Sequence, residues 1–321
     1  MLLYRKTRHL KQYIMKQINF IPIEEKTMND KLVNLYGSHL VGLYTKAEVI
    51  YTHKWYKKHV KPAAPLLIEL EEYPDGHYPY EEADVRVMIF GRETNNWKDG
   101  DRQKDAKTYT EYGTYNFHLQ TNDDILAEIR GKHTDANGND LPESEERKGL
   151  TDIYIDYLYR REEDGPNKGE RIRTGKTPFT KWNYNFIDAL QVRLGSKRVE
   201  FVWNNLFKIG KGNIGSSARG ESPAFIRDIE KECFDVIRQE IEILKPDIII
   251  FAPLTADNVI VEKFGLENSD FQLIDDKLPE LRRIEIPGIK YAARTIHPAY
   301  KSNDILNEYN NALIEDILKH I

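Results

Sequence analysis

Three short segments of the chain contain residue types that could cleave a polar bond or recognise a ligand by hydrogen bonding. They are Gly91-Arg92-Glu93-Thr94-Asn95, Trp203-Asn204-Asn205-Leu206-Phe207-Lys208 and Ile296-His297-Pro298-Ala299-Tyr300. A carboxylate can stabilise a developing positive charge, and an imidazole can donate a hydrogen bond to a departing anion. A carboxamide offers both donors and acceptors to the edge of a flat polar molecule. The three segments could therefore form one site, provided that the fold brings them to the same place.

Each segment follows a short apolar run of the kind that forms a buried strand. We predict strands at 85–90, 199–203, 247–253, 281–286 and 291–296. Helices are predicted at 180–194, near 255–264, at 303–319, and from Pro223 to Lys245 with Ser222 as the N-cap. This alternation predicts an α/β fold with a mostly parallel sheet that is covered on both faces. Ligands of such sheets bind beyond the carboxyl ends of the strands, where these segments lie.

The region before the first strand differs in composition from the rest. Residues 2–19 and 29–60 have helical patterns, and Lys61-Pro62-Ala63-Ala64-Pro65 should end the second helix. We therefore predict a basic helical N-terminal extension at 1–65. A domain at 66–321 would follow, with long insertion loops between about 98 and 180.

Composition narrows the class of protein. With 40% hydrophobic and 31% charged residues in 321, the chain has the composition of a globular domain. It has no apolar run of the roughly 20 residues that span a bilayer and no secretory signal, so we expect a cytoplasmic protein without a membrane partner. Cys233 is the single cysteine and fits a core position, so a disulfide, an iron–sulfur cluster or an all-cysteine metal site cannot form within the chain.

Charge is spread unevenly along the chain. Residues 1–62 hold twelve Lys and Arg against four Asp and Glu, whereas the remainder holds 35 against 48. A basic arm could hold a polyanion such as DNA, with Trp55 and Tyr56 adding apolar contacts. The same arm could equally dock onto the acidic body of the protein.

The ordered set of motifs resembles the uracil-DNA glycosylase superfamily. GRETN, WNNLFK and IHPAY stand where that family has its first-strand loop, its Asn at a strand end and its His-Pro turn, and LKPDIIIFAP resembles the strand between the last two. The resemblance covers about residues 84–320 and implies a three-layer α/β/α fold. Thr94 replaces a proline of the family loop, which leaves open whether the base is uracil.

The resemblance also implies roles for individual residues. Glu93 would lie beneath the sugar and stabilise its positive charge, and His297 would donate to the leaving base. Asn205 would read the edge of a flipped base, with Asn204 as the alternative. Further candidates for the base site are Gly91, Asn95, Phe117 and Tyr300, although Asn95 could belong to a turn and Phe117 to the core. Candidates for DNA phosphate contacts are Lys208, Lys211, Arg219 and Lys301.

Three functions stay open at this point. The first is a DNA glycosylase that removes a damaged or modified base without a metal or cofactor, with a base of viral DNA as one candidate substrate. The second is a DNA-binding member of the fold that has lost the reaction. The third is a hydrolase of free nucleosides or nucleotides, for which an acidic body would be suitable.

Overall fold

The structure is a computed structural model with side chains. It describes residues 19–52, 62–73, 76–93, 119, 121–131, 149–161, 171–175, 177–210, 222–253 and 257–321. Residues 2–18 of the predicted helix at 2–19 lie outside these ranges, as does most of the segment between 94 and 148.

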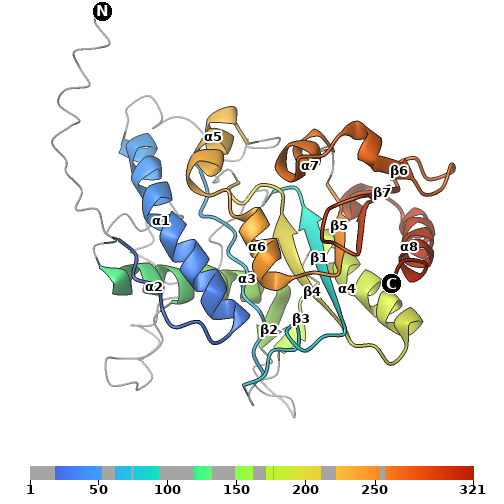
Figure 1. Cartoon of the computed structure of the whole chain (residues 1–321), viewed down its shortest axis with the longest axis horizontal. Helices are drawn as coiled ribbons and strands as arrows, with labels where there is room; N and C mark the ends of the chain where they lie inside the picture. Colours follow the sequence, from blue (N-terminus) through green and yellow to red (C-terminus); the bar gives the residue numbers. More distant parts are fainter. Residues whose placement is uncertain are drawn as a thin grey trace, which may run out of the picture.

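A mixed sheet of six strands forms the centre of the described molecule, in the order β4-β1-β5-β8-β7-β6 (Figure 1). Four neighbours are parallel: β4 (Val199–Asn205), β1 (Val85–Gly91), β5 (Ile248–Phe251) and β8 (Tyr291–Arg294). Two antiparallel strands, β7 (Arg282–Ile284) and β6 (Phe271–Leu273), complete the other edge. All five predicted strands are thus present, and β6 is an addition that the sequence analysis missed.

Helices cover both faces of this sheet, as predicted for a three-layer α/β/α arrangement (Figure 1). One face carries α5 (Ala224–Cys233), α6 (Ile237–Leu244) and α7 (Asp257–Phe264), with α1 (Met28–Thr52) packed on α5 and α6. The other face carries α4 (Pro178–Leu194) and α8 (Asn303–Leu318). Helix α3 (Leu150–Leu158) lies beside β4 and leads into a hairpin of β2 (Tyr159–Arg161) and β3 (Arg171–Arg173). Helix α2 (Asn122–Arg130) packs on α1 and α3.

The prediction of one helix from Pro223 to Lys245 is wrong. The chain leaves the helical conformation between α5 and α6, where Phe234 and Val236 are both fully buried. Burial of these two side chains requires a change of direction that a straight helix could not make. The apolar periodicity continues across the break, which is why the pattern did not reveal it.

Helix α1 of the N-terminal region packs into the main core. Leu32, Tyr36 and Leu40 of α1 are fully buried and belong to the same core as the sheet residues. The segment after the predicted break is also buried, and the backbone N–H of Leu66 donates to the carbonyl of Lys208. Among residues 19–52 and 62–73, the described part of this region, both sides of the expected division at residue 65 thus contribute to one core.

The sheet edge at β4 is closed by a tyrosine. The hydroxyl of Tyr154 in α3 donates to the carbonyl of Trp203 at 2.9 Å and accepts from the N–H of the same residue at 2.9 Å. This satisfies backbone groups that an edge strand would otherwise present to another chain. None of the described helices combines the length and the hydropathy needed to span a membrane.

Candidate functional site at the carboxyl edge of the sheet

The carboxyl ends of the parallel strands bring two of the three predicted segments directly together. Gly91, the last residue of β1, pairs with Asn205, the last residue of β4. β8 lies two positions from β1, beyond β5, and the His-Pro turn follows it three residues after Arg294. Because the pleat alternates, Gly91 and Asn205 lie on the face of the sheet that α4 covers.

Phe179, near the start of α4, connects this pair with the third segment. A Cβ built on Gly91 would lie 3.3 Å from the Phe179 ring, and the same ring stacks on the His297 imidazole with centroids 5.8 Å apart. The start of α4 is held by a capping box between Thr177 and Thr180. The ring of Phe179 is thereby placed between the end of β1 and the His-Pro turn.

Asn205 is buried beneath this aromatic contact, with only 1% of its surface exposed. Its Oδ1 accepts a hydrogen bond from the indole N–H of Trp203 at 3.2 Å. Its Nδ2 is buried and has no hydrogen-bond partner among the described residues. A Cβ on Gly91 would lie 2.6 Å from Oδ1, so the carboxamide can adopt this position only because residue 91 is glycine.

The tautomer of His297 follows from its hydrogen bond. The backbone N–H of Ala299 donates to Nδ1 of His297 at 3.2 Å, so this nitrogen carries no proton. Burial lowers the pKa of His297 from 6.5 to about 4. The imidazole is therefore neutral at physiological pH, with its single proton on Nε2 as a hydrogen-bond donor.

Glu93 stands two residues after β1, and a serine from another element holds it. The hydroxyl of Ser222 donates to Oε2 of Glu93 at 2.5 Å. The prediction that Ser222 caps the next helix is wrong, because Pro223 occupies the N-cap position and Ser222 makes no capping bond. The serine instead fixes the carboxylate at the start of the loop that follows β1.

Asn204 is on the opposite face and takes part in a buried polar network. Its Nδ2 donates to Glu240 at 2.9 Å, and its Oδ1 accepts from Lys208 at 2.9 Å. Tyr36 of α1 donates to the same Glu240 at 2.7 Å. With all these partners in place, Asn204 serves to join β4, α6 and α1, and it does not face Phe179 and His297.

The structure contradicts the predicted phosphate contact of Lys208. Its side chain is 0% exposed, and its ammonium group lies 2.6 Å from a carboxylate oxygen of Glu240, which is also 0% exposed. Burial lowers the pKa of Lys208, and the facing carboxylate acts against this shift. A lysine held in this way cannot reach a phosphate at the surface.

Several other predicted residues are not placed. Asn95, Phe117, Lys211 and Arg219 lie outside the described ranges, as does the side chain of Tyr300. Lys301 is described and exposed, and its nearest acidic partner is Glu280 at 3.9 Å. Its predicted contact with DNA stays a prediction.

Sequence reasoning missed Phe179, Trp203 and Ser222. Phe179 stands just before the helix predicted at 180–194, and Trp203 is the last residue of the strand predicted at 199–203, where an aromatic side chain is typical of the core. The spacing between Trp203 and Asn205 could have indicated a contact between their side chains, since residues two apart on a strand point to the same face of the sheet.

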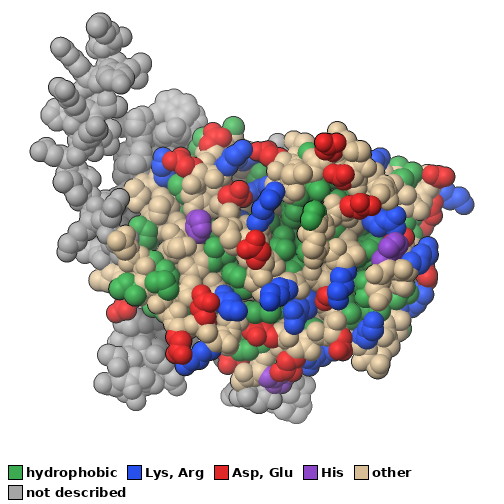
Figure 2. Space-filling model, in the orientation of Figure 1, with side chains coloured by type: hydrophobic (Ala, Val, Ile, Leu, Met, Phe, Trp, Pro, Cys, Tyr) green, Lys and Arg blue, Asp and Glu red, His purple; other side chains and the backbone are tan. Residues whose placement is uncertain are grey.

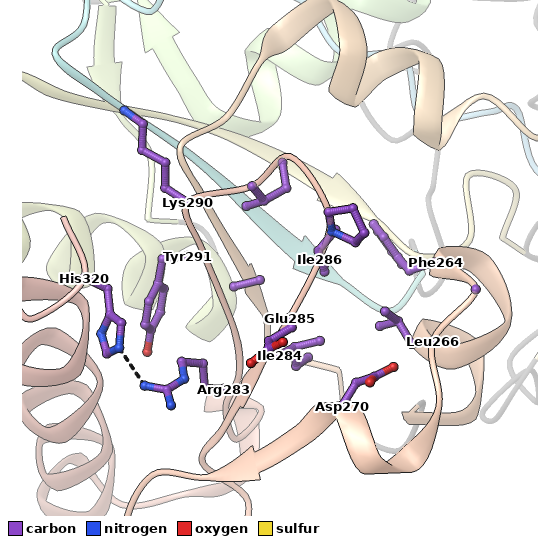
Figure 3. A pocket seen from close by; sticks show the side chains of 14 residues that line it. Phe264, Leu266, Asp270, Arg283, Ile284, Glu285, Ile286, Lys290, Tyr291 and His320 are labelled. Atoms are coloured by element: carbon purple, nitrogen blue, oxygen red, sulfur yellow. Dashed lines mark hydrogen bonds between the residues drawn. The ribbon is translucent and has the colours of Figure 1, made fainter.

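The opposite end of β8 contains a separate hollow of about 650 Å³ (Figure 3). It lies between the end of α7, the loop before β8 and the end of α8, and no residue of the predicted site lines it. Figure 3 shows Arg283 pointing to His320, and the two nitrogens lie 2.7 Å apart. Arg283 also donates to Gln272 at 2.9 Å, and Lys290, which lines the same hollow, pairs with Asp247 at 2.6 Å.

The face seen in Figure 2 carries Lys, Arg, Asp and Glu side chains interspersed, without a continuous area of one sign. Within the described ranges, no three His, Cys, Asp or Glu side chains are close enough together to hold a metal ion. Models of known protein families do not match this chain, and no curated protein matches it.

Proposed function

We propose that the protein is a DNA glycosylase-like hydrolase that cleaves the N-glycosidic bond of a damaged or modified base in DNA. The observation that carries this proposal is the gathering of Gly91, Asn205 and His297 around Phe179 at one sheet edge. The imidazole there is neutral, and the amide nitrogen of Asn205 is buried without a hydrogen-bond partner among the described residues. The resemblance of the three motifs to the uracil-DNA glycosylase superfamily points in the same direction.

The reaction that these groups suit is hydrolysis through a cationic sugar. The bond between the sugar C1′ and the base nitrogen breaks, and the base takes the bonding electrons as an anion. Water then adds its oxygen to C1′, and its released proton neutralises the base. Glu93, held by Ser222, would stabilise the positive sugar and orient this water.

His297 would act as a neutral donor rather than as an acid. With a pKa of about 4, only about one molecule in a thousand carries the imidazolium at pH 7. The Nε2–H group would donate a hydrogen bond to an oxygen of the departing base and stabilise its negative charge. Because the imidazole keeps its proton, this role requires no change in its protonation state.

The buried amide of Asn205 supports a base-reading role. An unsatisfied buried N–H costs about 1–3 kcal/mol, and a ligand that accepts a hydrogen bond from Nδ2 would recover that cost. A base flipped out of the duplex offers acceptors along its edge. The DNA partner would be engaged by exposed cations such as Lys301 and by the basic residues of 1–62.

The proposal is tested by base release from oligonucleotides that each contain one uracil or another modified base, followed by cleavage of the abasic site. Wild-type protein should release at least one base, and Glu93→Ala and His297→Ala should each reduce the rate at least about 100-fold. His320→Gln is the matched control, because this histidine lies at the other end of the sheet against Tyr291.

Equal behaviour of wild type, Glu93→Ala and His297→Ala on every base would refute the catalytic proposal. Salt-dependent DNA binding without release would indicate the inactive binding member of the fold. Turnover of free nucleosides without affinity for oligonucleotides would indicate the small-molecule hydrolase.

A further inference from the structure

Small side chains occupy the last row of the parallel sheet beneath α4. Gly91 is the last residue of β1. Ala252 continues the ladder beyond β5 and Thr295 beyond β8, through backbone hydrogen bonds of 2.9 and 2.8 Å to the neighbouring strands. Two residues back on the same face, the positions of β1 and β5 hold the larger Ile89 and Ile250, which pair directly. Side chains of the sheet therefore fill less of the space below α4 at its carboxyl end.

Asn183 of α4 projects toward this row. It lies one turn after Phe179, whose ring reaches Gly91, and residues four apart on a helix share a face. A helical Cβ tilts toward the N-terminus of its helix, so the carboxamide is directed back toward the carboxyl end of the sheet. The side chains of this face of α4 are all buried: Phe179, Asn183, Phe186, Ile187 and Leu190.

Thr295 meets the same space from the side of the sheet. Tyr291 and Thr295 are an even number of residues apart and so share a face, and the hydroxyl of Tyr291 donates to Asp316 of α8. This is the face that α4 and α8 cover. The stacking of His297 on Phe179, two residues further along, agrees with this placement.

Three polar atoms of these two side chains have no hydrogen-bond partner within the described residues. Asn183 and Thr295 are both 0% exposed, and the atoms concerned are Oδ1 and Nδ2 of Asn183 and Oγ1 of Thr295. A buried polar group without a partner shifts the equilibrium toward the unfolded state by roughly 5- to 100-fold. Water placed between the two side chains recovers this loss, because it can both donate and accept.

We propose that Asn183 and Thr295 bind water in a buried site between α4 and the carboxyl end of the sheet. The amide oxygen accepts, the amide nitrogen donates and the hydroxyl does both, which supplies the two to four partners that a buried water needs. The Phe179 ring, one turn nearer the carboxyl edge, covers this space. The bound water is thus a part of the folded protein and is distinct from the water that hydrolysis consumes.

The substitution Asn183→Leu tests this proposal through the sign of its effect on stability, in a measurement without DNA that does not depend on the proposed function. Leucine has nearly the shape of asparagine and no polar atom. Loss of the bound water leaves the Thr295 hydroxyl without a partner, so the equilibrium constant for unfolding should rise about 10-fold or more in urea denaturation. An unchanged or smaller constant would show that the amide had no partner to lose, and would overturn the proposal.

A second substitution shows whether both side chains hold the same water. Asn183→Leu already displaces it, so adding Thr295→Val should raise the unfolding constant at least about 3-fold less than the product of the single effects. Thr151→Val is the matched control, because its buried hydroxyl donates to the carbonyl of Ile129 at 3.0 Å and its effect should multiply with that of Asn183→Leu. Simple multiplication for Thr295→Val as well would overturn the shared site.

The water itself can be located in a crystal structure of the wild-type protein, which makes the result independent of how any variant folds. Density for at least one water should lie within about 3.2 Å of both the Asn183 carboxamide and Oγ1 of Thr295. The same density should be missing in Asn183→Leu. Side chains that fill this space, with no density for water between them, would overturn the proposal whatever the stability of the variants.

Discussion

Two neighbouring asparagines at the end of β4 have opposite surroundings. Asn204 points to the α6 face, where Glu240 and Lys208 satisfy its side chain. Asn205 points to the α4 face, where its oxygen has one partner and its nitrogen has none in the described structure. A complete polar network stabilises the fold, whereas a buried donor without a partner costs stability that a ligand with an acceptor would recover.

The largest effect should come from breaking the network around Asn204 at its charged pair. Lys208→Met leaves Glu240 buried without its counter-charge and should lower the free energy of unfolding by about 3–5 kcal/mol. Urea denaturation followed by circular dichroism would measure this loss. The double variant Lys208→Met with Glu240→Leu should recover much of the lost stability, because no unpaired charge remains. A Lys208→Met protein as stable as wild type would show that the pair is not buried.

Replacing each of the two asparagines by leucine tests whether they have different roles. Asn204→Leu should cost about 2–3 kcal/mol of unfolding free energy, because Lys208 and Glu240 each lose a partner. Asn205→Leu should change stability by less than about 1 kcal/mol, since the lost bond to Trp203 is offset by removal of an unsatisfied donor, yet it should abolish base release. If the two variants lose stability equally, the proposed division between a structural and a ligand-facing asparagine is wrong.

A smaller effect is expected from the titration of His297. Its pKa of about 4 in the folded protein lies below the value near 6.5 in the unfolded chain, so between these values the unfolded state binds more protons. Stability should therefore fall as the pH is lowered from about 6.5 toward 4, by about 1–2 kcal/mol at pH 5 when partial exposure is allowed for. His297→Gln should remove this component of the pH dependence, measured as unfolding free energy at pH 5 and 7.5, while His320→Gln keeps it.

The smallest effect concerns the surface beside the site. Lys301 is exposed after the His-Pro turn, and Lys301→Gln should weaken oligonucleotide binding about 3-fold at low salt and reduce the salt slope by about 1. Lys290→Gln is the control, because Lys290 lies before β8 at the opposite end and pairs with Asp247 at 2.6 Å. Equal losses in both variants would indicate a general charge effect rather than a local contact.

Much of the fold was predictable because apolar periodicity is a local property. The parallel strands and the helices α4, α7 and α8 were expected within a few residues of their observed bounds. The break between α5 and α6 was not, because it depends on where Phe234 and Val236 are buried. Short elements such as β6 were also missed, since three residues at a sheet edge carry little pattern.

The amino-acid sequence alone determined which residue types stand at the strand ends and therefore placed Glu93, Asn205 and His297 at the carboxyl edge of the sheet. Only the tertiary structure decided how neighbours such as Asn204 and Lys208 are used, because burial and hydrogen-bond partners come from distant segments such as α1 and α6. It also decided the orientation of the Asn205 amide, which depends on the indole N–H of Trp203. The tautomer of His297 depends in the same way on the backbone N–H of Ala299, and the fold holds both donors in place.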